Sequence, residues 1–471
     1  MDREITSLQA GNSHLIDVRV RQNGHDFIGE LSIQDSLIAL VIHGENSDDR
    51  SFDFDGYKKD ELQCDTLRES FLLRNLQLQR WSSHFLNSAN KSTVAFKAEY
   101  KAQEIYLTRG GYGTTFPRNV AAIEIASKQI GQWIGRTAKQ DSIIGSFGAA
   151  FEADQEFLLP LENQGAIAAI YKIKKGYSLP EFKSEMTFAP SLELVFESTK
   201  TIEEATRETK KLISLLSFVF GLRPCVDTVK FHYASTGYAR FSTCKSIHWP
   251  HKIQEESTIL APYNIMDPTD GGNPWQPIFS KYFSNDFPER EVFDKYEKYR
   301  QLDNIEERLL GYFRLLEKLT HKKAHFLDSE RLISLMNRSE PFLVKYFNDP
   351  KNVRSFLRQI ERANGSKYNT EKCLSDFLSS ISESRRKDWA LGKRDLANIC
   401  KLRNDIIHAN EYSIEEDKIY QMTAFVEILL TYKLSDLILF PRQATDKFVE
   451  RHPMHRIIEH PPTVRHTNSA P

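Results

Sequence analysis

Residues 403–408 read Arg-Asn-Asp-Ile-Ile-His, and the apolar residues in and before this stretch recur at helical spacing. At about 100° per residue, Ile399, Leu402 and Ile406 share one face of the expected helix. Arg403 falls inside that apolar arc, where a guanidinium is costly to bury unless it meets a carboxylate, a carbonyl or a phosphate. The stretch therefore predicts a helix that carries a charged functional group.

Arginine and histidine are the pair of side chains needed to break an RNA phosphodiester without a metal. His408 can move a proton near neutral pH, and Arg403 can hold the charge on the phosphorus oxygens. RNA supplies its own nucleophile, the 2′-hydroxyl, so the protein has only to move protons and stabilise a pentacoordinate phosphate. Asn404 would orient the histidine or the phosphate.

The two catalytic candidates do not point the same way in a straight helix, because five residues correspond to about 140° of rotation. Either the stem of Arg403 curls round the helix edge, or two copies of the helix meet across a two-fold axis. The second arrangement predicts a homo-oligomer with a composite site between protomers.

An ordinary structural interpretation of the same residues stays open. A histidine in the last turn of a helix is favoured by the helix dipole and often only caps carbonyl groups. An arginine at the margin of an apolar face often extends its charged end to solvent. The alternative hypothesis is a non-catalytic module that binds RNA or a protein partner and has a regulatory role.

Bulk composition describes an ordinary globular protein. A chain of 471 residues is long enough for two or three domains, and its net charge of −1 does not direct it to nucleic acid as a whole. The cysteines are odd in number and without CxxC spacing, which favours a reducing compartment. The first residues lack an apolar signal region, and no apolar run reaches membrane-spanning length. We expect a cytoplasmic protein with no membrane contact.

Two other patterns are weak candidates for ligand sites. Cys225, Cys244, His248 and His251 lie close together in sequence, but their spacing fits no known zinc module. Residues 110–115, Gly-Gly-Tyr-Gly-Thr-Thr, lack the lysine of a phosphate-binding P-loop and are more typical of a turn between strands. We expect neither a metal nor another cofactor.

Periodicity divides the chain into a sheet-rich part and a helical part, an α+β multidomain protein. Alternating strand-like segments fill residues 1–200, and an intermediate helix-strand segment with a Pro/Gly-rich linker follows at 201–275. Residues 276–440 show successive amphipathic helices with short connections, which predicts an antiparallel bundle. Residues 441–471 are basic and rich in histidine and proline, so we expect a flexible tail.

Several charged residues of the helical part are candidates for supporting roles. Glu317, in the first long helix of the bundle, could supply the counter-charge that Arg403 requires. Lys393-Arg394 and Lys322-Lys323 are local basic groups that could hold an RNA backbone. Such groups are more often solvated helix faces, so this assignment stays open.

The hexapeptide, placed in a C-terminal helical bundle, resembles the RNxxxH signature of HEPN ribonucleases. The resemblance assigns catalysis to Arg403 and His408 and a characteristic polar position to Asn404. The succession of a sheet-rich region, an intermediate segment and a terminal bundle also resembles the ApeA-type anti-phage HEPN proteins.

This resemblance implies a dimeric, metal-independent endoribonuclease that acts on RNA, plausibly tRNA, in abortive infection. Its products would be a 2′,3′-cyclic phosphate and a 5′-hydroxyl. A constitutively active ribonuclease would harm its host, so we expect a latent enzyme whose N-terminal region senses a phage-derived trigger.

Overall fold

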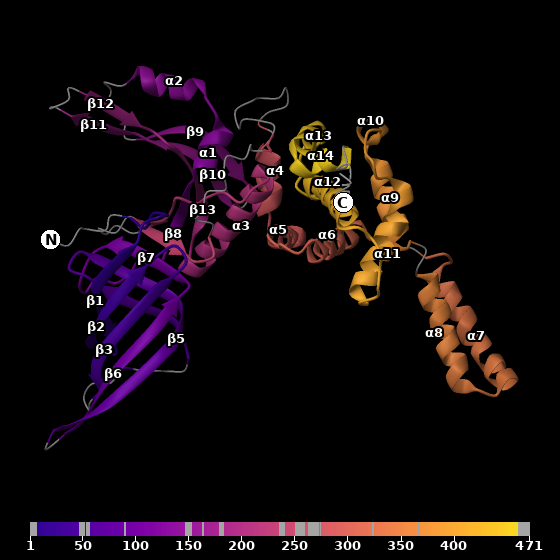
Figure 1. The fold of residues 1–471 in the computed structure, drawn as a ribbon, viewed down its shortest axis with the longest axis horizontal. Coiled ribbons are helices and arrows are strands. Elements are labelled where there is room, and N and C mark those ends of the chain that lie inside the picture. The colour runs from indigo at the N-terminus through magenta and orange to yellow at the C-terminus, as the bar shows by residue number, and fades with distance from the viewer. Residues whose placement is uncertain are drawn as a thin grey trace, which may run out of the picture. The chain divides into compact units, whose positions relative to one another are not determined.

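The computed structural model describes residues 7–46, 52, 57–88, 91–146, 153–162, 164–178, 183–234, 241–249, 260–261, 273, 275–322, 325–365 and 368–459. The chain divides into two compact units, Met1–Pro288 and Glu289–Pro471 (Figure 1). The first unit is built on a large sheet and the second is helical, which confirms the α+β architecture. No helix among these described residues is long and apolar enough to cross a membrane.

The first unit contains a thirteen-stranded sheet with the order β4-β1-β2-β3-β6-β5-β7-β15-β14-β8-β13-β10-β9. Every recorded strand pair in it is antiparallel, as expected for strands that alternate apolar and polar residues. Its strands are β1 His14–Gln22, β2 His25–Ile33, β3 Ile38–Asn46, β4 Lys58–Asp65, β5 Glu69–Ser88, β6 Lys91–Ala102, β7 Glu104–Arg109, β8 Val120–Ala126, β9 Ala153–Leu161, β10 Gly165–Lys172, β13 Pro190–Lys200, β14 Thr228–Tyr233 and β15 Phe241–Ser246. A separate ribbon pairs β11 Lys174–Ser178 with β12 Lys183–Thr187.

Six of these strands close on themselves, because β4 pairs with β5 as well as with β1. The enclosed core contains Phe27, Phe52 and Phe96, whose rings lie 5.1–5.7 Å apart. Gly44 makes this packing possible, because a Cβ there would lie 2.5 Å from the ring of Phe27. Such close ring packing fixes the register of β2, β3 and β6.

Three helices, α1 Lys128–Ile134, α3 Ile202–Phe220 and α4 Trp275–Phe283, pack against the remaining strands. Their aromatic side chains meet at Trp133, whose ring lies 4.9 Å from that of Trp275 and 5.7 Å from that of Phe220. Thr201-Ile202-Glu203-Glu204 has the sequence pattern of a capping box, and this capping box begins α3, while Gly221 ends the helix with a left-handed φ of 67°. A short helix, α2 Ala138–Gly145, precedes β9.

The structure differs from the domain boundary expected at residue 200. β14 and β15, assigned to an intermediate segment, lie between β7 and β8 in the middle of the sheet. Strand pairing depends on register between distant segments, which local periodicity does not record. The expected Pro/Gly-rich linker covers residues 261–277. Most of it lies outside the described residues, and its last part, 275–277, already belongs to α4.

The second unit is a bundle in which α6 packs on α12, with α5, α9, α11, α13 and α14 around them. Its helices are α5 Glu291–Arg300, α6 Ile305–Thr320, α7 Ser329–Phe347, α8 Pro350–Asn364, α9 Thr370–Ser380, α10 Glu383–Arg386, α11 Leu396–Ile407, α12 Glu416–Leu437, α13 Arg442–Arg451 and α14 Pro453–Glu459. Two short 3-10 turns, η1 Pro288–Arg290 and η2 Lys393–Asp395, complete the described elements. At the centre, the hydroxyls of Tyr296 and Tyr312 donate hydrogen bonds to the buried carboxylate of Glu427.

Within this unit, α7 and α8 form a hairpin with a small core of its own. Met336 on α7 packs with Val353 and Leu357 on α8. Asp349 caps α8 and Pro350 occupies its first turn, as the sequence predicts.

The expected flexible tail is wrong for residues 442–459. They form α13 and α14, which bury Phe448, Val449 and Ile458, and the Ala390 N–H donates to the Ile458 carbonyl at 2.7 Å. Pro441 and Pro453 stand at helix N-termini, where proline is tolerated, so they do not prevent helix formation. Residues 460–471 lie outside the described residues.

Candidate functional site

The RNDIIH motif lies at the C-terminal end of α11. Leu396, Ile399 and Leu402 are buried and turn one face of the helix toward α6 and α9. This places Arg403 half-buried at the margin of the packed face, whereas Asn404 is exposed. The apolar pattern of the helix thus positions the guanidinium at the edge of the bundle core.

Arg403 is held by groups from two helices. Its Nη2 donates to Glu317 Oε2 on α6 at 2.9 Å, and its Nη1 donates to the side-chain oxygen of Asn404 at 2.8 Å. The guanidinium also lies over the ring of Phe313, 5.4 Å from its centroid. Glu317 therefore occupies the counter-charge position that the sequence suggested, and cation, carboxylate and ring fix the direction of the arginine.

A second layer of contacts orients Glu317. The hydroxyl of Thr370, in the first turn of α9, donates to Glu317 Oε1 at 2.6 Å. Thr370 carried no sequence signal, because its role depends on the packing of α9 against α6. The three residues form a chain from Thr370 through Glu317 to Arg403.

These groups line a small cavity of about 210 Å³. Its walls come from α6, α9 and α11 and consist of Phe313, Asn369, Thr370, Glu371, Cys400, Arg403 and Asn404. The volume is below the usual range for a whole small-molecule ligand, but it suffices for a phosphate group.

Cys400 also lines the cavity but is not a nucleophile. Burial raises the pKa of its thiol to about 11, and the carboxylates of Glu371 and Glu317 act in the same direction. The thiol stays protonated at neutral pH, and a thiol attacks far more slowly than a thiolate. The reactive groups of this site are therefore the polar side chains of the motif.

His408 stands just beyond the last turn of α11. Its backbone N–H donates to the Asn404 carbonyl at 3.0 Å, and Ala409 then takes a left-handed φ of 52° that ends the helix. Its side chain is exposed and does not line the cavity around Arg403. Within one chain, the structure thus gathers Arg403, Asn404 and Glu317 and leaves the histidine outside.

The weaker RNA-binding candidates are scattered. Lys393 and Arg394 are exposed in η2, before the first residue of α11 and so about 18 Å along the helix axis from His408. Lys322 lies 3.9 Å from Asp376, and Lys323 lies outside the described residues. None of Lys393, Arg394 and Lys322 lines the cavity that contains Arg403.

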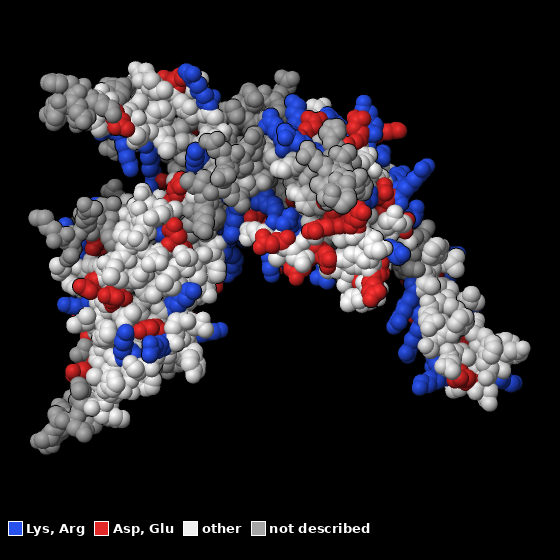
Figure 2. All heavy atoms as spheres, viewed as in Figure 1, with Lys and Arg blue, Asp and Glu red and all other residues white. Residues whose placement is uncertain are grey.

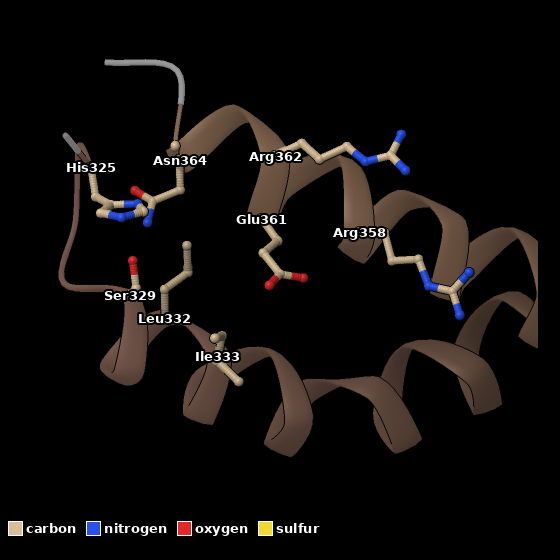
Figure 3. A pocket seen from close by; sticks show the side chains of 9 residues that line it. His325, Ser329, Leu332, Ile333, Arg358, Glu361, Arg362 and Asn364 are labelled. Atoms are coloured by element: carbon tan, nitrogen blue, oxygen red, sulfur yellow. The ribbon is translucent and has the colours of Figure 1, made fainter. Parts of the chain in front are cut away.

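A larger cavity, of about 620 Å³, lies on the α7–α8 hairpin and contains no residue of the motif (Figure 3). Glu361 points into the space between the two helices, and His325, Arg358 and Arg362 also line the cavity. Size alone therefore does not locate the site of the motif, since Arg403 and Asn404 line the smaller cavity.

The segment that contains Cys225, Cys244, His248 and His251 shows no metal-binding cluster among its described residues. Cys244 is buried and its Sγ donates to the Val229 carbonyl at 3.4 Å, while His251 lies outside the described residues. In the described part of the chain, no three His, Cys, Asp or Glu side chains gather in a metal-binding group.

Comparison with protein families gives one match, in which residues 310–443 fit the family described as Apea-like HEPN. The chain contains an Apea-like HEPN domain. The matched range begins in α6 and ends in α13, so it includes Glu317, the cavity and the whole motif. HEPN domains are generally nucleases, which indicates a function of ribonuclease type or in defence. Neither a curated protein nor a solved structure matches the chain.

Proposed function

We propose that the HEPN domain is a metal-independent endoribonuclease of an abortive-infection system that acts against phage. The observation that carries the proposal is the fixed guanidinium of Arg403, held by Glu317 at 2.9 Å beside a cavity of phosphate size. An arginine oriented before the substrate arrives stabilises developing charge without reorganisation.

In the proposed reaction, His408 removes the proton of the ribose 2′-hydroxyl, whose oxygen attacks the adjacent phosphorus. The 5′-oxygen leaves with a proton from a second acid, and the products are a 2′,3′-cyclic phosphate and a 5′-hydroxyl. Arg403 binds the non-bridging oxygens, and Asn404 orients the phosphate or the histidine. DNA lacks the 2′-hydroxyl and should stay intact.

The second acid is the histidine of another copy. His408 is exposed and stands apart from the cavity that contains Arg403. A two-fold arrangement of two α11 helices would bring two Arg403–His408 sets together and supply both base and acid. The proposal therefore includes a homo-oligomer with a composite site.

We further propose that the enzyme is latent, that tRNA is its substrate and that the first unit responds to a phage-derived trigger. A separate sheet-based unit in the same chain leaves room for such control. Cleavage of host tRNA would stop translation and phage replication together.

The test is cleavage of bulk cellular RNA in excess EDTA by the full-length protein, with and without lysate from phage-infected cells. Arg403→Ala and His408→Ala should each abolish the fragments that end in a cyclic phosphate. Arg456→Ala and His321→Ala remove an exposed cation and an exposed imidazole elsewhere in the unit and serve as matched controls.

The alternative is a non-catalytic HEPN module that binds RNA or a protein partner. It is favoured by the exposed position of His408 outside the cavity. Salt-dependent RNA binding without cleavage in any condition, unchanged by His408→Ala, would support the module and contradict the nuclease.

A further inference from the structure

The α7–α8 hairpin exposes more large apolar side chains than a solvated helix pair needs. On α7, Leu335, Phe342 and Tyr346 are 61%, 68% and 73% exposed, and Phe356 on α8 is 56% exposed. Within the described part of the unit, the two helices pack extensively only on each other. Contiguous exposed apolar side chains of this kind mark an interaction surface.

The exposed residues of α7 follow a heptad pattern. Leu335, Ser339, Phe342 and Tyr346 are separated alternately by four and three residues. This spacing produces a straight apolar seam that a second helix can cover. The rings of Phe342 and Tyr346 are already stacked, 6.2 Å apart with an interplanar angle of 22°, so part of the surface is ordered in advance.

One side of the hairpin carries this seam. The ion pair between Arg354 and Glu340, at 2.8 Å, fixes the opposite side, because both residues lie there together with the larger cavity. At about 100° per residue, Phe356 falls on the other flank of α8 and therefore joins the seam of α7. We call the surface formed by Leu335, Phe342, Tyr346 and Phe356 the apolar face of the hairpin.

Cations border the apolar face along its α7 edge. Arg331, Arg338 and Lys345, each seven residues apart, occupy the edge of α7 that turns away from α8.

Lys351, Arg358 and Arg362 of α8 do not border this face, because they fall on the flank of α8 opposite to Phe356, where Arg358 and Arg362 line the larger cavity. Figure 2 shows mainly white atoms over the hairpin and blue atoms along its edge.

We propose that the apolar face binds an amphipathic helix of a partner protein whose flanking positions are acidic. A two-helix hairpin buries one row of residues from each helix, and a third helix completes a three-helix core. Glutamate or aspartate beside the partner's apolar stripe would lie against Arg331, Arg338 and Lys345 along the α7 edge.

A second copy of the hairpin fits less well, because its flank of α8 beside Phe356 carries Asn352, Gln359 and Ala363 and so presents no acidic residues to the cations of the α7 edge. RNA fits less well because Leu335 and Phe356 offer no polar group to a nucleotide and Leu335 offers no ring for stacking. The charge pattern thus selects the acidic helix.

The test uses two labelled helical peptides of about three heptads with leucine at the a and d positions. One carries glutamate at e and g and the other lysine, and fluorescence anisotropy measures their binding to the full chain. The glutamate peptide should bind at least about tenfold more tightly, and added salt should weaken it.

Variants locate the binding to the apolar face. Phe342→Ser should weaken the glutamate peptide by at least about tenfold, as expected for a central aromatic contact. The double change Arg338→Glu with Lys345→Glu should reverse the preference between the two peptides. Ile144→Ser, which removes a side chain that is 54% exposed on α2, is the matched control and should change nothing.

Three outcomes would overturn the proposal. The first is equal binding, or no binding, of the two peptides. The second is self-association lost in Phe342→Ser, which would assign the face to another copy of the chain. The third is binding of RNA or of anionic phosphatidylglycerol vesicles that is lost in Phe342→Ser while neither peptide binds. Equal circular dichroism of the variants checks that all of them fold.

Discussion

Removal of the Glu317 carboxylate tests whether Arg403 is catalytically useful because it is held in place. In Glu317→Ala, the guanidinium loses its partner at 2.9 Å and keeps only Asn404 and the ring of Phe313. The side chains of the pair are 26% and 29% exposed, so its strength lies between that of a surface pair and that of a buried one. We take about 1–2 kcal/mol for the interaction.

A loss of that size in the transition state corresponds to a rate about 5- to 30-fold lower. Arg403→Ala should cost more, about a hundredfold to a thousandfold, because it removes the whole charge from the phosphate. Thr370→Val, which removes only the 2.6 Å hydrogen bond to Glu317, should lower the rate by about threefold. The expected loss of rate thus decreases from Arg403, which binds the phosphate, to Glu317 and then to Thr370.

The assay is the rate of cyclic-phosphate formation under the condition in which the wild type cuts RNA. Glu371→Ala is the control, because it removes a carboxylate from the same cavity without removing the partner of Arg403. The double variant Glu317→Ala with Arg403→Ala should be no slower than Arg403→Ala alone, since Glu317 acts through the arginine. Full activity of Glu317→Ala, or additive losses in the double variant, would refute the reasoning.

Three further predictions concern stability. Burial lowers the pKa of His452 to about 3, so below about pH 6.5 the unfolded chain binds a proton that the folded bundle does not. The free energy of unfolding should therefore fall by at most about 1.4 kcal/mol per pH unit as the pH is lowered. In urea unfolding between pH 7 and 5, His452→Leu should flatten this slope, and an unchanged slope would contradict the prediction. Glu427→Leu leaves the buried Tyr296 and Tyr312 hydroxyls without their acceptor and should destabilise the bundle by about 2–4 kcal/mol, seen as faster amide exchange in α12, whereas unaltered exchange would argue against this network. Gly111→Ala would place a Cβ 2.2 Å from the Leu67 carbonyl oxygen at a φ of +65° and should cost about 2 kcal/mol or more, so a wild-type thermal midpoint would disprove the constraint.

Local signals in the sequence predicted local structure well. The capping box at Thr201 and the Asp349-Pro350 helix start depend on groups a few residues apart, and both are present. The helical periodicity around the motif predicts a helix over about residues 393–409, and the 3-10 turn η2 and α11 begin and end close to these residues. In such places the chain contains the whole physical cause within one or two turns.

Features that depend on distant partners were not accessible in the same way. The insertion of β14 and β15 into the middle of the sheet is decided by pairing with β7 and β8. The contact of Thr370 with Glu317 depends on how α9 packs on α6. α7 was not predicted, because Pro341 lies inside it and its apolar residues cover two faces, one for α8 and one exposed. The exposed apolar face is therefore one reason why the sequence did not predict α7. The same face is the feature of α7 that indicates a binding surface.

The last helix, α14, affects the order in which the second unit can fold during translation. Trp389, a few residues before the motif helix, has its ring 6.0 Å from that of Phe425 on α12 and 6.4 Å from that of His455 on α14. A growing polypeptide that has not yet been translated past residue 459 therefore lacks one wall around the segment that leads into α11. If translation stopped before that point, the motif helix would lack this support. The ribonuclease activity that we propose for the motif would therefore depend on the completion of these last helical turns.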